Sequence, residues 1–118
     1  MTTSNITIFH NARCSNSRGA LQLLRERGIE PNIVNYLETP LTAPALAELV
    51  AHIGLPVRDL LRSKEPQYQQ FHLDNPALSD ADLFSIVAAH PQLLNRPIVV
   101  TPQGAALCRP PEKVLELL

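Results

Sequence analysis

The sequence predicts an α/β fold with a mixed central sheet, in the order β-α-β, a helical middle and β-β-α. Short apolar runs of strand length alternate with longer stretches in which apolar residues recur at helical spacing, and prolines and glycines separate the two. With 118 residues, of which 45% are hydrophobic, the chain can bury one core without a disulfide or a metal. We therefore predict a single domain over residues 1–118.

The chain opens with a predicted β-α-β unit. Residues 6–9 form a short apolar strand, an amphipathic helix follows and ends at Gly28, and residues 32–36 form a second short strand. A helix of this length between two short strands suits a right-handed crossover between parallel neighbours. The first two strands should therefore be parallel.

The middle of the chain is predicted to be helical. Thr42 caps a helix with apolar residues at the i, i+3, i+4 and i+7 spacing, and Gly54 ends it. The pattern weakens over residues 56–76, where we expect short helices and turns. Ser79, with Asp82 three residues later, predicts a capping box at the start of another helix.

The chain ends with a predicted hairpin and a helix. Residues 97–108 form two short apolar strands around a turn at Pro102-Gln103-Gly104. Pro110 and Pro111 then place proline in the first turn of a terminal helix.

Charge and composition limit the partners that we expect. The net charge of −1 argues against a general nucleic-acid binder or a binder of anionic membranes. No apolar run approaches the about 18 residues of a membrane span, and residues 1–5 lack the pattern of a signal peptide. We expect a cytoplasmic monomer with no nucleic-acid or membrane partner, whose two cysteines are reduced.

Cys14 is the candidate nucleophile. It follows a strand and precedes a helix, so unpaired backbone N–H groups and the helix dipole should lower its pKa below the free value of about 8.5. Arg13 and Arg18 add positive charge on either side. The alternative is a buried, inert cysteine, but the polar and basic neighbours favour a thiolate. His10 could tune the pKa of Cys14 or assist proton transfer, or it could merely shape the turn.

Several arginines stand at the predicted element boundaries: Arg18, Arg62, Arg96 and Arg109. Arg96 and Arg109 should project from one edge of the sheet. The planar, permanently charged guanidinium group matches a tetrahedral oxyanion, so several of them around a thiolate would hold an oxyanion for attack. Taken singly, each could equally be a solvated surface charge.

Two other classes of cysteine enzyme are excluded because their motifs are absent from the sequence. Arg18 is too near Cys14 for the Cys-x5-Arg loop of a tyrosine phosphatase, and Ser17 removes a Cys-x-x-Cys dithiol. Reduction must then use an external thiol or Cys108, for which packing is the alternative role. We predict no metal site and no nucleotide site, because the glycines are dispersed and the remaining histidines lack ligand spacing: His52, His72 and His90.

Taken in order, the motifs resemble the glutaredoxin-coupled arsenate reductase family, ArsC. The matching segments are His10-Asn11 to Cys14, Ser17-Arg18, Tyr36-Leu37-Glu38-Thr39-Pro40, Leu60-Leu61-Arg62, residues 95–101 and Leu107-Cys108-Arg109-Pro110. Ala12 stands where the family has proline, and Arg13 replaces a small residue. The resemblance implies a thioredoxin-like fold with a helical insertion and a cis bond between Arg96 and Pro97.

The resemblance also implies an activity: reduction of arsenate to arsenite through a cysteine–arsenate adduct, in arsenic detoxification. Glutathione is the implied cosubstrate and glutaredoxin the partner, with no bound cofactor. The implied site residues are Cys14 as nucleophile, His10 and Arg18 beside it, and Ser17, Arg62, Arg96 and Arg109 as ligands of the oxyanion.

Two alternatives remain open. Regulators of the Spx type, which bind RNA polymerase and sense thiol oxidation, have a related fold, but their switch is Cys-x-x-Cys, which Ser17 removes. The other alternative is a reductase of the same fold that acts on another oxyanion or on glutathionylated proteins.

Overall fold

The computed structural model describes residues 5–118. The prediction that residues 1–5 are not a signal peptide therefore falls almost entirely outside the described residues. The chain divides into two compact units, Met1–Thr39 with Arg96–Leu118 and Pro40–Asn95. We describe each unit by itself. The single domain over residues 1–118 stays a prediction. Over residues 5–118 no helix combines the length and the apolar character that a membrane crossing requires.

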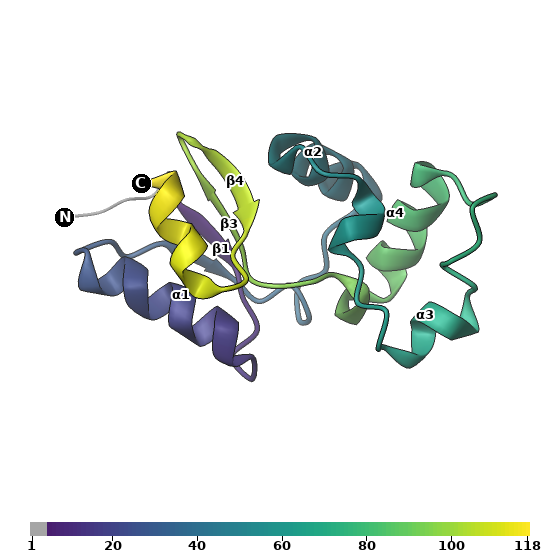
Figure 1. Ribbon diagram of the computed structural model, residues 1–118, viewed down its shortest axis with the longest axis horizontal. Coiled ribbons are helices and arrows are strands. Elements are labelled where there is room, and N and C mark those ends of the chain that lie inside the picture. The colour runs from purple at the N-terminus through teal and green to yellow at the C-terminus, as the bar shows by residue number, and fades with distance from the viewer. Residues whose placement is uncertain (1–4) are drawn as a thin grey trace. The chain divides into compact units, whose positions relative to one another are not determined.

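The first unit contains a mixed four-stranded sheet in the order β2-β1-β3-β4 (Figure 1). Its strands are β1 Thr7–Phe9, β2 Asn32–Val34, β3 Ile98–Thr101 and β4 Gly104–Leu107. As predicted, β1 runs parallel to β2, and α1 (Ser15–Glu26) connects them. The pairs β1–β3 and β3–β4 are antiparallel, which confirms the hairpin.

The second strand is shorter than the sequence predicts. It ends at Val34, because the Asn35 carbonyl accepts hydrogen bonds from the N–H groups of Glu38 and Thr39 and closes a turn. Tyr36 is nevertheless buried, with 1% of its surface exposed. It packs into the interior from the turn that follows β2 and not from the strand itself.

Helix α1 packs beside the C-terminal helix η3, Pro111–Leu117 (Figure 1). The terminal helix was predicted, and the structure makes it a 3-10 helix with proline in its first turn. Both helices contribute to one apolar cluster with residues of the sheet: Ile6, Ile8, Ala20, Leu21, Leu24, Val99, Cys108, Val114 and Leu117. This core packs α1 and η3 against the sheet.

Gly19 is the point of closest approach between α1 and η3. A Cβ atom at this position would lie 2.9 Å from Cγ and 3.2 Å from Cβ of Pro111. The first distance is shorter than carbon atoms tolerate, so the two helices can pack at this distance only because residue 19 has no side chain.

The second unit is helical, as predicted. Its elements are α2 Ala43–Ile53, η1 Val57–Leu60, α3 Pro66–Gln70, α4 Asp80–Ala89 and η2 Pro91–Leu93. Thr42 caps α2, and Gly54 ends it in the left-handed conformation, with φ of 80°. The capping box of Ser79 and Asp82 is present at the start of α4. The residues that cap these helices are therefore sufficient to predict where α2 begins and ends and where α4 begins.

Arg58 holds the chain between α3 and α4. Its guanidinium group donates to the carbonyl oxygens of Leu73 at 2.6 Å, Asn75 at 2.9 Å and Leu78 at 3.0 Å. Hydrogen bonds from a charged donor are stronger than neutral ones, so Arg58→Ala should lower the free energy of unfolding by about 1–3 kcal/mol. Denaturant titration measures this change, with Arg27→Ala as the control at an exposed arginine. Equal stability of the two variants would show that these bonds contribute nothing.

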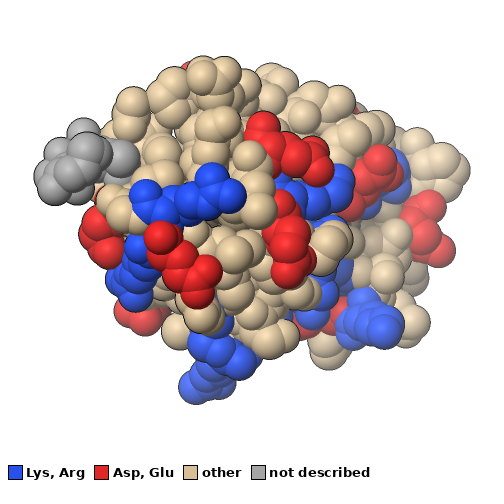
Figure 2. All heavy atoms as spheres, turned by 60° about the vertical axis from the view of Figure 1, so that its left-hand side comes forward, with Lys and Arg blue, Asp and Glu red and all other residues tan. Residues whose placement is uncertain are grey.

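Acidic and basic side chains both cover the face that Figure 2 presents, without a continuous field of one sign. This mixture accords with the net charge of −1. A strong anion site on this protein must therefore be built from a few local groups.

Candidate active site

Cys14 lies on the predicted turn between β1 and α1, as the N-cap residue of the helix. Its backbone is extended, with φ of −92° and ψ of 125°, and its carbonyl oxygen accepts from the N–H of Arg18 at 3.0 Å. Its side chain lacks the oxygen acceptor of a conventional N-cap residue. The sulfur is therefore left beside the N–H groups of the first helical turn, which have no partner within a helix.

The surroundings of Cys14 favour the thiolate. Burial disfavours the charge and by itself would raise the pKa. Hydrogen bonds outweigh burial: those from the backbone N–H groups of Ser17 and Asn16 and from the side chains of Arg96 and Ser17 lower the pKa of Cys14 from 9.0 to about 7. The partly buried thiol is thus a nucleophile at neutral pH.

Two residues brace the turn that carries Cys14. The Oγ atom of fully buried Ser17 accepts from the N–H of Asn11 at 3.3 Å, and Asn11 Oδ1 accepts from the N–H of Arg13 at 2.9 Å. The carbonyl oxygen of Asn11 also accepts from the N–H of Cys14 at 2.9 Å. Sequence reasoning gave Asn11 no role, although an asparagine two residues before an N–H donor is a known turn signal.

Arg109 reaches the sulfur from the other end of the chain. Its Nη1 atom lies 3.7 Å from Cys14 Sγ and donates to the carbonyl oxygen of Arg96 at 2.9 Å. Because Ile98 pairs with Leu107, the residues that flank this hairpin meet at one edge of the sheet. The structure thus brings Arg96 and Arg109 together at Cys14, and the peptide bonds Arg96–Pro97 and Arg109–Pro110 are both cis.

Asn16 adds a contact that the sequence did not indicate. With its amide oxygen turned toward Arg109, it accepts from Nη2 at 3.2 Å and from Nη1 at 3.3 Å. Arg109 is therefore held from two sides, by Asn16 of α1 and by the carbonyl oxygen of Arg96. A guanidinium group fixed in this way keeps its orientation toward whatever binds at the sulfur.

His10 and Arg18 lie near the thiol but have different surroundings. His10 is 6% exposed, and burial together with the charges of Arg25 and Arg18 lowers its pKa, so its imidazole is neutral at pH 7. Its Nδ1 atom has no hydrogen-bond partner among residues 5–118. Arg18 is exposed, and its Nη1 atom donates to the carbonyl oxygen of Ala12 at 2.8 Å.

Arg62 belongs to the second unit. Its Nη1 atom donates to Asn95 Oδ1 at 3.1 Å, and its Nε atom lies 3.5 Å from Glu65 Oε2 in a partly buried ion pair. The backbone N–H of Arg62 also donates to the carbonyl oxygen of Leu93 at 2.8 Å. The prediction that Arg62 joins Arg96 and Arg109 stays a prediction.

Cys108 packs in the core of the first unit. The sequence left two roles open for this cysteine, packing and attack on an intermediate formed at Cys14, and its position is the one expected for packing. Its side chain is 0% exposed, and burial raises the pKa of its thiol to about 11. Cys108 thus remains a thiol under conditions in which Cys14 is ionised.

The different pKa values of the two cysteines predict the pH profile of alkylation. Iodoacetamide should modify one thiol per chain with a rate that rises through about pH 7, because about half of Cys14 is ionised there. Lowering the pH to 6 should cut the rate several-fold, since a smaller fraction is thiolate. Mass spectrometry after timed quenching measures the rate and locates the label. A midpoint near pH 9 would contradict the arrangement described above.

Comparisons with known proteins identify relatives of this chain. The sequence model of the ArsC family matches residues 9–117. The arsenate reductase of Escherichia coli (strain K12) is 49% identical over 115 residues, which are 98% of this chain and 82% of that protein. A second protein of that strain, named "Uncharacterized protein YfgD", is 44% identical over 117 residues, or 98% of each chain.

A solved structure matches as well. The arsenate reductase from Vibrio cholerae superposes with a TM-score of 0.93 and is 44% identical in sequence. The superposition covers 100% of this chain and 98% of that one. The likeness therefore includes both compact units.

Proposed function

This chain belongs to the ArsC family and has its thioredoxin-like fold, and we propose that it reduces arsenate to arsenite with Cys14 as the nucleophile. One observation carries the proposal: the thiol of Cys14, with its pKa lowered to about 7, lies 3.7 Å from the Arg109 guanidinium group. A thiolate beside a fixed cation suits attack on an oxyanion, because the cation holds the substrate and stabilises the negative charge of the transition state.

In the proposed first step, the thiolate of Cys14 attacks arsenic, and an oxygen of arsenate leaves as water after protonation. The product has a sulfur–arsenic(V) bond. Arg96 and Arg109 bind the remaining arsenate oxygens, and we assign Arg62 and Ser17 to the same task. Neutral His10 and the Arg18 charge flank the site. In addition to this assigned task, buried Ser17 braces the turn and donates a hydrogen bond to the sulfur.

Later steps need two further thiols, since Cys108 is buried and protonated. We propose that glutathione adds to arsenic with loss of a second water. Glutaredoxin then attacks the glutathione sulfur, so the electrons of the sulfur–arsenic bond stay on arsenic, which becomes arsenic(III). A mixed disulfide between glutaredoxin and glutathione leaves. Water then releases arsenite and regenerates Cys14. We place this reaction in the cytoplasm, where glutathione is reduced.

NADPH oxidation by the purified protein tests the proposal. The assay contains arsenate, glutathione, glutaredoxin and glutathione reductase, and a parallel assay replaces the last three with thioredoxin and its reductase. Turnover in the first mixture alone would support both the substrate and the donor. Turnover with thioredoxin alone would reject the donor. Absence of turnover in both, with Cys14 still reactive at pH 7, would favour a reductase for another oxyanion.

A further inference from the structure

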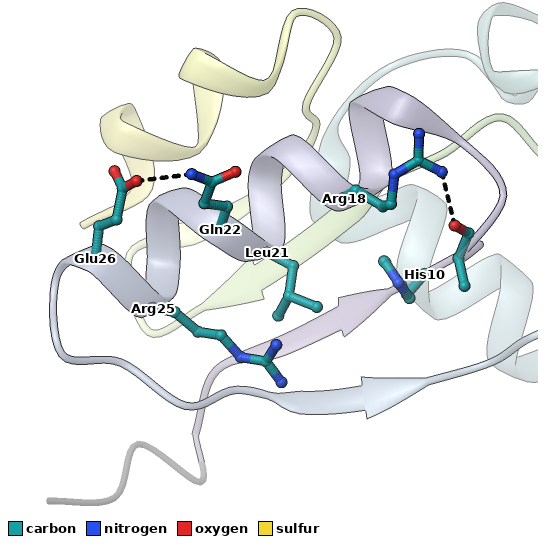
Figure 3. Close-up of a pocket in the computed structure, with 7 residues that line it drawn as sticks. His10, Arg18, Leu21, Gln22, Arg25 and Glu26 are labelled. Atoms are coloured by element: carbon teal, nitrogen blue, oxygen red, sulfur yellow. Dashed lines mark hydrogen bonds between the residues drawn. The ribbon is translucent and has the colours of Figure 1, made fainter.

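An open cavity of about 600 Å³ lies between α1 and the end of β1 (Figure 3). Its lining comes from His10, Ala12, Arg18, Leu21, Gln22, Arg25 and Glu26. Figure 3 shows Leu21 and Arg25 pointing from α1 toward the strands, with His10 beside Leu21. Arg18 is four residues after Cys14, about 6 Å along the helix axis, so the cavity begins next to the nucleophile.

Two arginines and one glutamate line the cavity, so its lining has more positive than negative charge. Arg18 and Arg25 are two helical turns apart on α1, and both lower the pKa of His10, so the field of both guanidinium groups acts on the imidazole. Glu26 follows Arg25 at the end of the cavity farther from Cys14 and accepts from Gln22 Nε2 at 3.0 Å, whereas Arg18 is at the nearer end. The end next to the nucleophile is therefore suited to an anion.

Arg25 already has one anionic partner, Glu30. Its Nε and Nη2 atoms donate to the two carboxylate oxygens at 2.9 Å each. Both side chains are more than half exposed, and such ion pairs are screened by water and contribute little. A ligand carboxylate in the cavity can therefore compete with Glu30 for Arg25.

His10 supplies an independent sign of a ligand. The side chain is more than nine-tenths buried and lines the cavity, and its Nδ1 atom has no partner among residues 5–118. Buried polar atoms are nearly always satisfied, and an exception indicates a group or water that completes the site. A polar ligand in this cavity would lie beside His10.

We propose that this cavity binds a terminal carboxylate of the tripeptide thiol that reacts at Cys14, with Arg18 and Arg25 as its anchors. This deepens the proposed function and depends on its assignment of glutathione as the thiol. An extended tripeptide spans about 10 Å and has its thiol on the central residue, so the thiol lies roughly half of this span from either end. A carboxylate at the Arg18 end of the cavity, about 6 Å along the helix axis from Cys14, therefore leaves the thiol within reach of the sulfur, and the side chain of Arg25 extends toward this end (Figure 3). Leu21 offers an apolar surface to the methylene groups of the ligand.

Disulfide exchange at Cys14 tests the proposal without arsenic. The thiolate of Cys14 attacks one sulfur of oxidised glutathione, which forms a Cys14–glutathione disulfide and releases one glutathione thiolate. Arg25→Gln should slow this reaction about three- to tenfold, because it removes a charge-assisted contact to the carboxylate. The same variant should react with bis(2-hydroxyethyl) disulfide, which has no carboxylate, at a rate within about twofold of the parent protein.

Arg27→Gln is the matched control, since Arg27 is an exposed arginine two residues along that is not part of the cavity lining. Equal slowing by Arg25→Gln and Arg27→Gln would show that the rate depends only on the net charge of the protein, and this would overturn the proposal. Equal slowing with both disulfides would also overturn it, because Arg25 would then act on the nucleophile rather than on the carboxylate. Arg25→Lys, which keeps the charge, should retain most of the preference for glutathione.

Binding of S-methylglutathione, which cannot react, gives a second measurement. Its addition should shift the imidazole signals of His10 in the NMR spectrum of the parent protein and shift them less in Arg25→Gln. Unchanged signals at saturating concentration would place the ligand elsewhere. Neither measurement uses arsenate, so failure of arsenate turnover would leave this site standing, and failure here would leave the arsenate proposal standing.

Discussion

Cys14→Ser should abolish arsenate reduction while leaving the protein folded. A serine hydroxyl is not ionised at neutral pH and forms no stable bond to arsenic, so the rate should fall about a thousandfold or more. The coupled NADPH assay measures the rate, and arsenite in the quenched reaction confirms the product.

This substitution suits the structure because Cys14 is the N-cap residue of α1. Serine is a preferred N-cap residue, so Cys14→Ser should keep the melting temperature or raise it. Cys108→Ser serves as the comparison for a buried thiol and should keep the turnover of whatever fraction folds. Turnover retained by Cys14→Ser would reject the thiolate mechanism.

Arg109→Ala should lower kcat/KM for arsenate about ten- to a hundredfold. The loss of a charge-assisted contact to an oxyanion costs about 1.5–3 kcal/mol, which corresponds to this factor. Most of the effect should be specific to the anion: Arg109 donates a hydrogen bond to the sulfur at 3.7 Å, but the hydrogen bonds from Arg96, Ser17 and Asn16 that lower the pKa of Cys14 remain in the variant. Alkylation of Cys14 by neutral iodoacetamide should therefore slow less than arsenate reduction, by about threefold or less.

Arg13→Ala is the control for Arg109→Ala, because it removes an exposed arginine adjacent in sequence to Cys14. It should leave kcat/KM within about twofold. Arg109→Lys keeps the charge but not the planar fork that contacts Asn16 and the Arg96 carbonyl oxygen, so it should be intermediate. If both alanine variants lose the same activity, the oxyanion role of Arg109 is wrong.

The elements that the sequence predicts best are those with signals at their own ends. Thr42 and Gly54 define α2, and the Ser79–Asp82 box starts α4, because the hydrogen bonds that end a helix are made within a few residues. The position of Cys14 at the start of α1 is predictable for the same reason. Strand length is less so: β2 ends two residues early because a turn at Asn35 competes for its backbone groups.

Contacts between distant residues have no local signal. Arg109 meets Cys14 across 95 positions of sequence; the sequence suggested arginines around the thiolate but left each of them equally open to a role as a solvated charge, and the family resemblance assigned Arg109 to the site. Asn16 and the three-carbonyl contact of Arg58 were not predicted, since their partners are defined only by the folded chain. The charge of a lone arginine does not reveal which carbonyl or sulfur it will reach.

The missing side chain of Gly19 governs the distance between substrate-binding and nucleophilic groups. Pro111 rests on it, two residues after Arg109, and Gly19 lies in the helix that Cys14 begins. Any larger residue at position 19 would act as a spacer that pushes the Arg109 segment away from the sulfur. A mutagenesis screen would then identify position 19 as essential for activity, although no substrate contacts it. Enlarging the site for a bulkier oxyanion could begin at this contact, with both reacting groups kept intact.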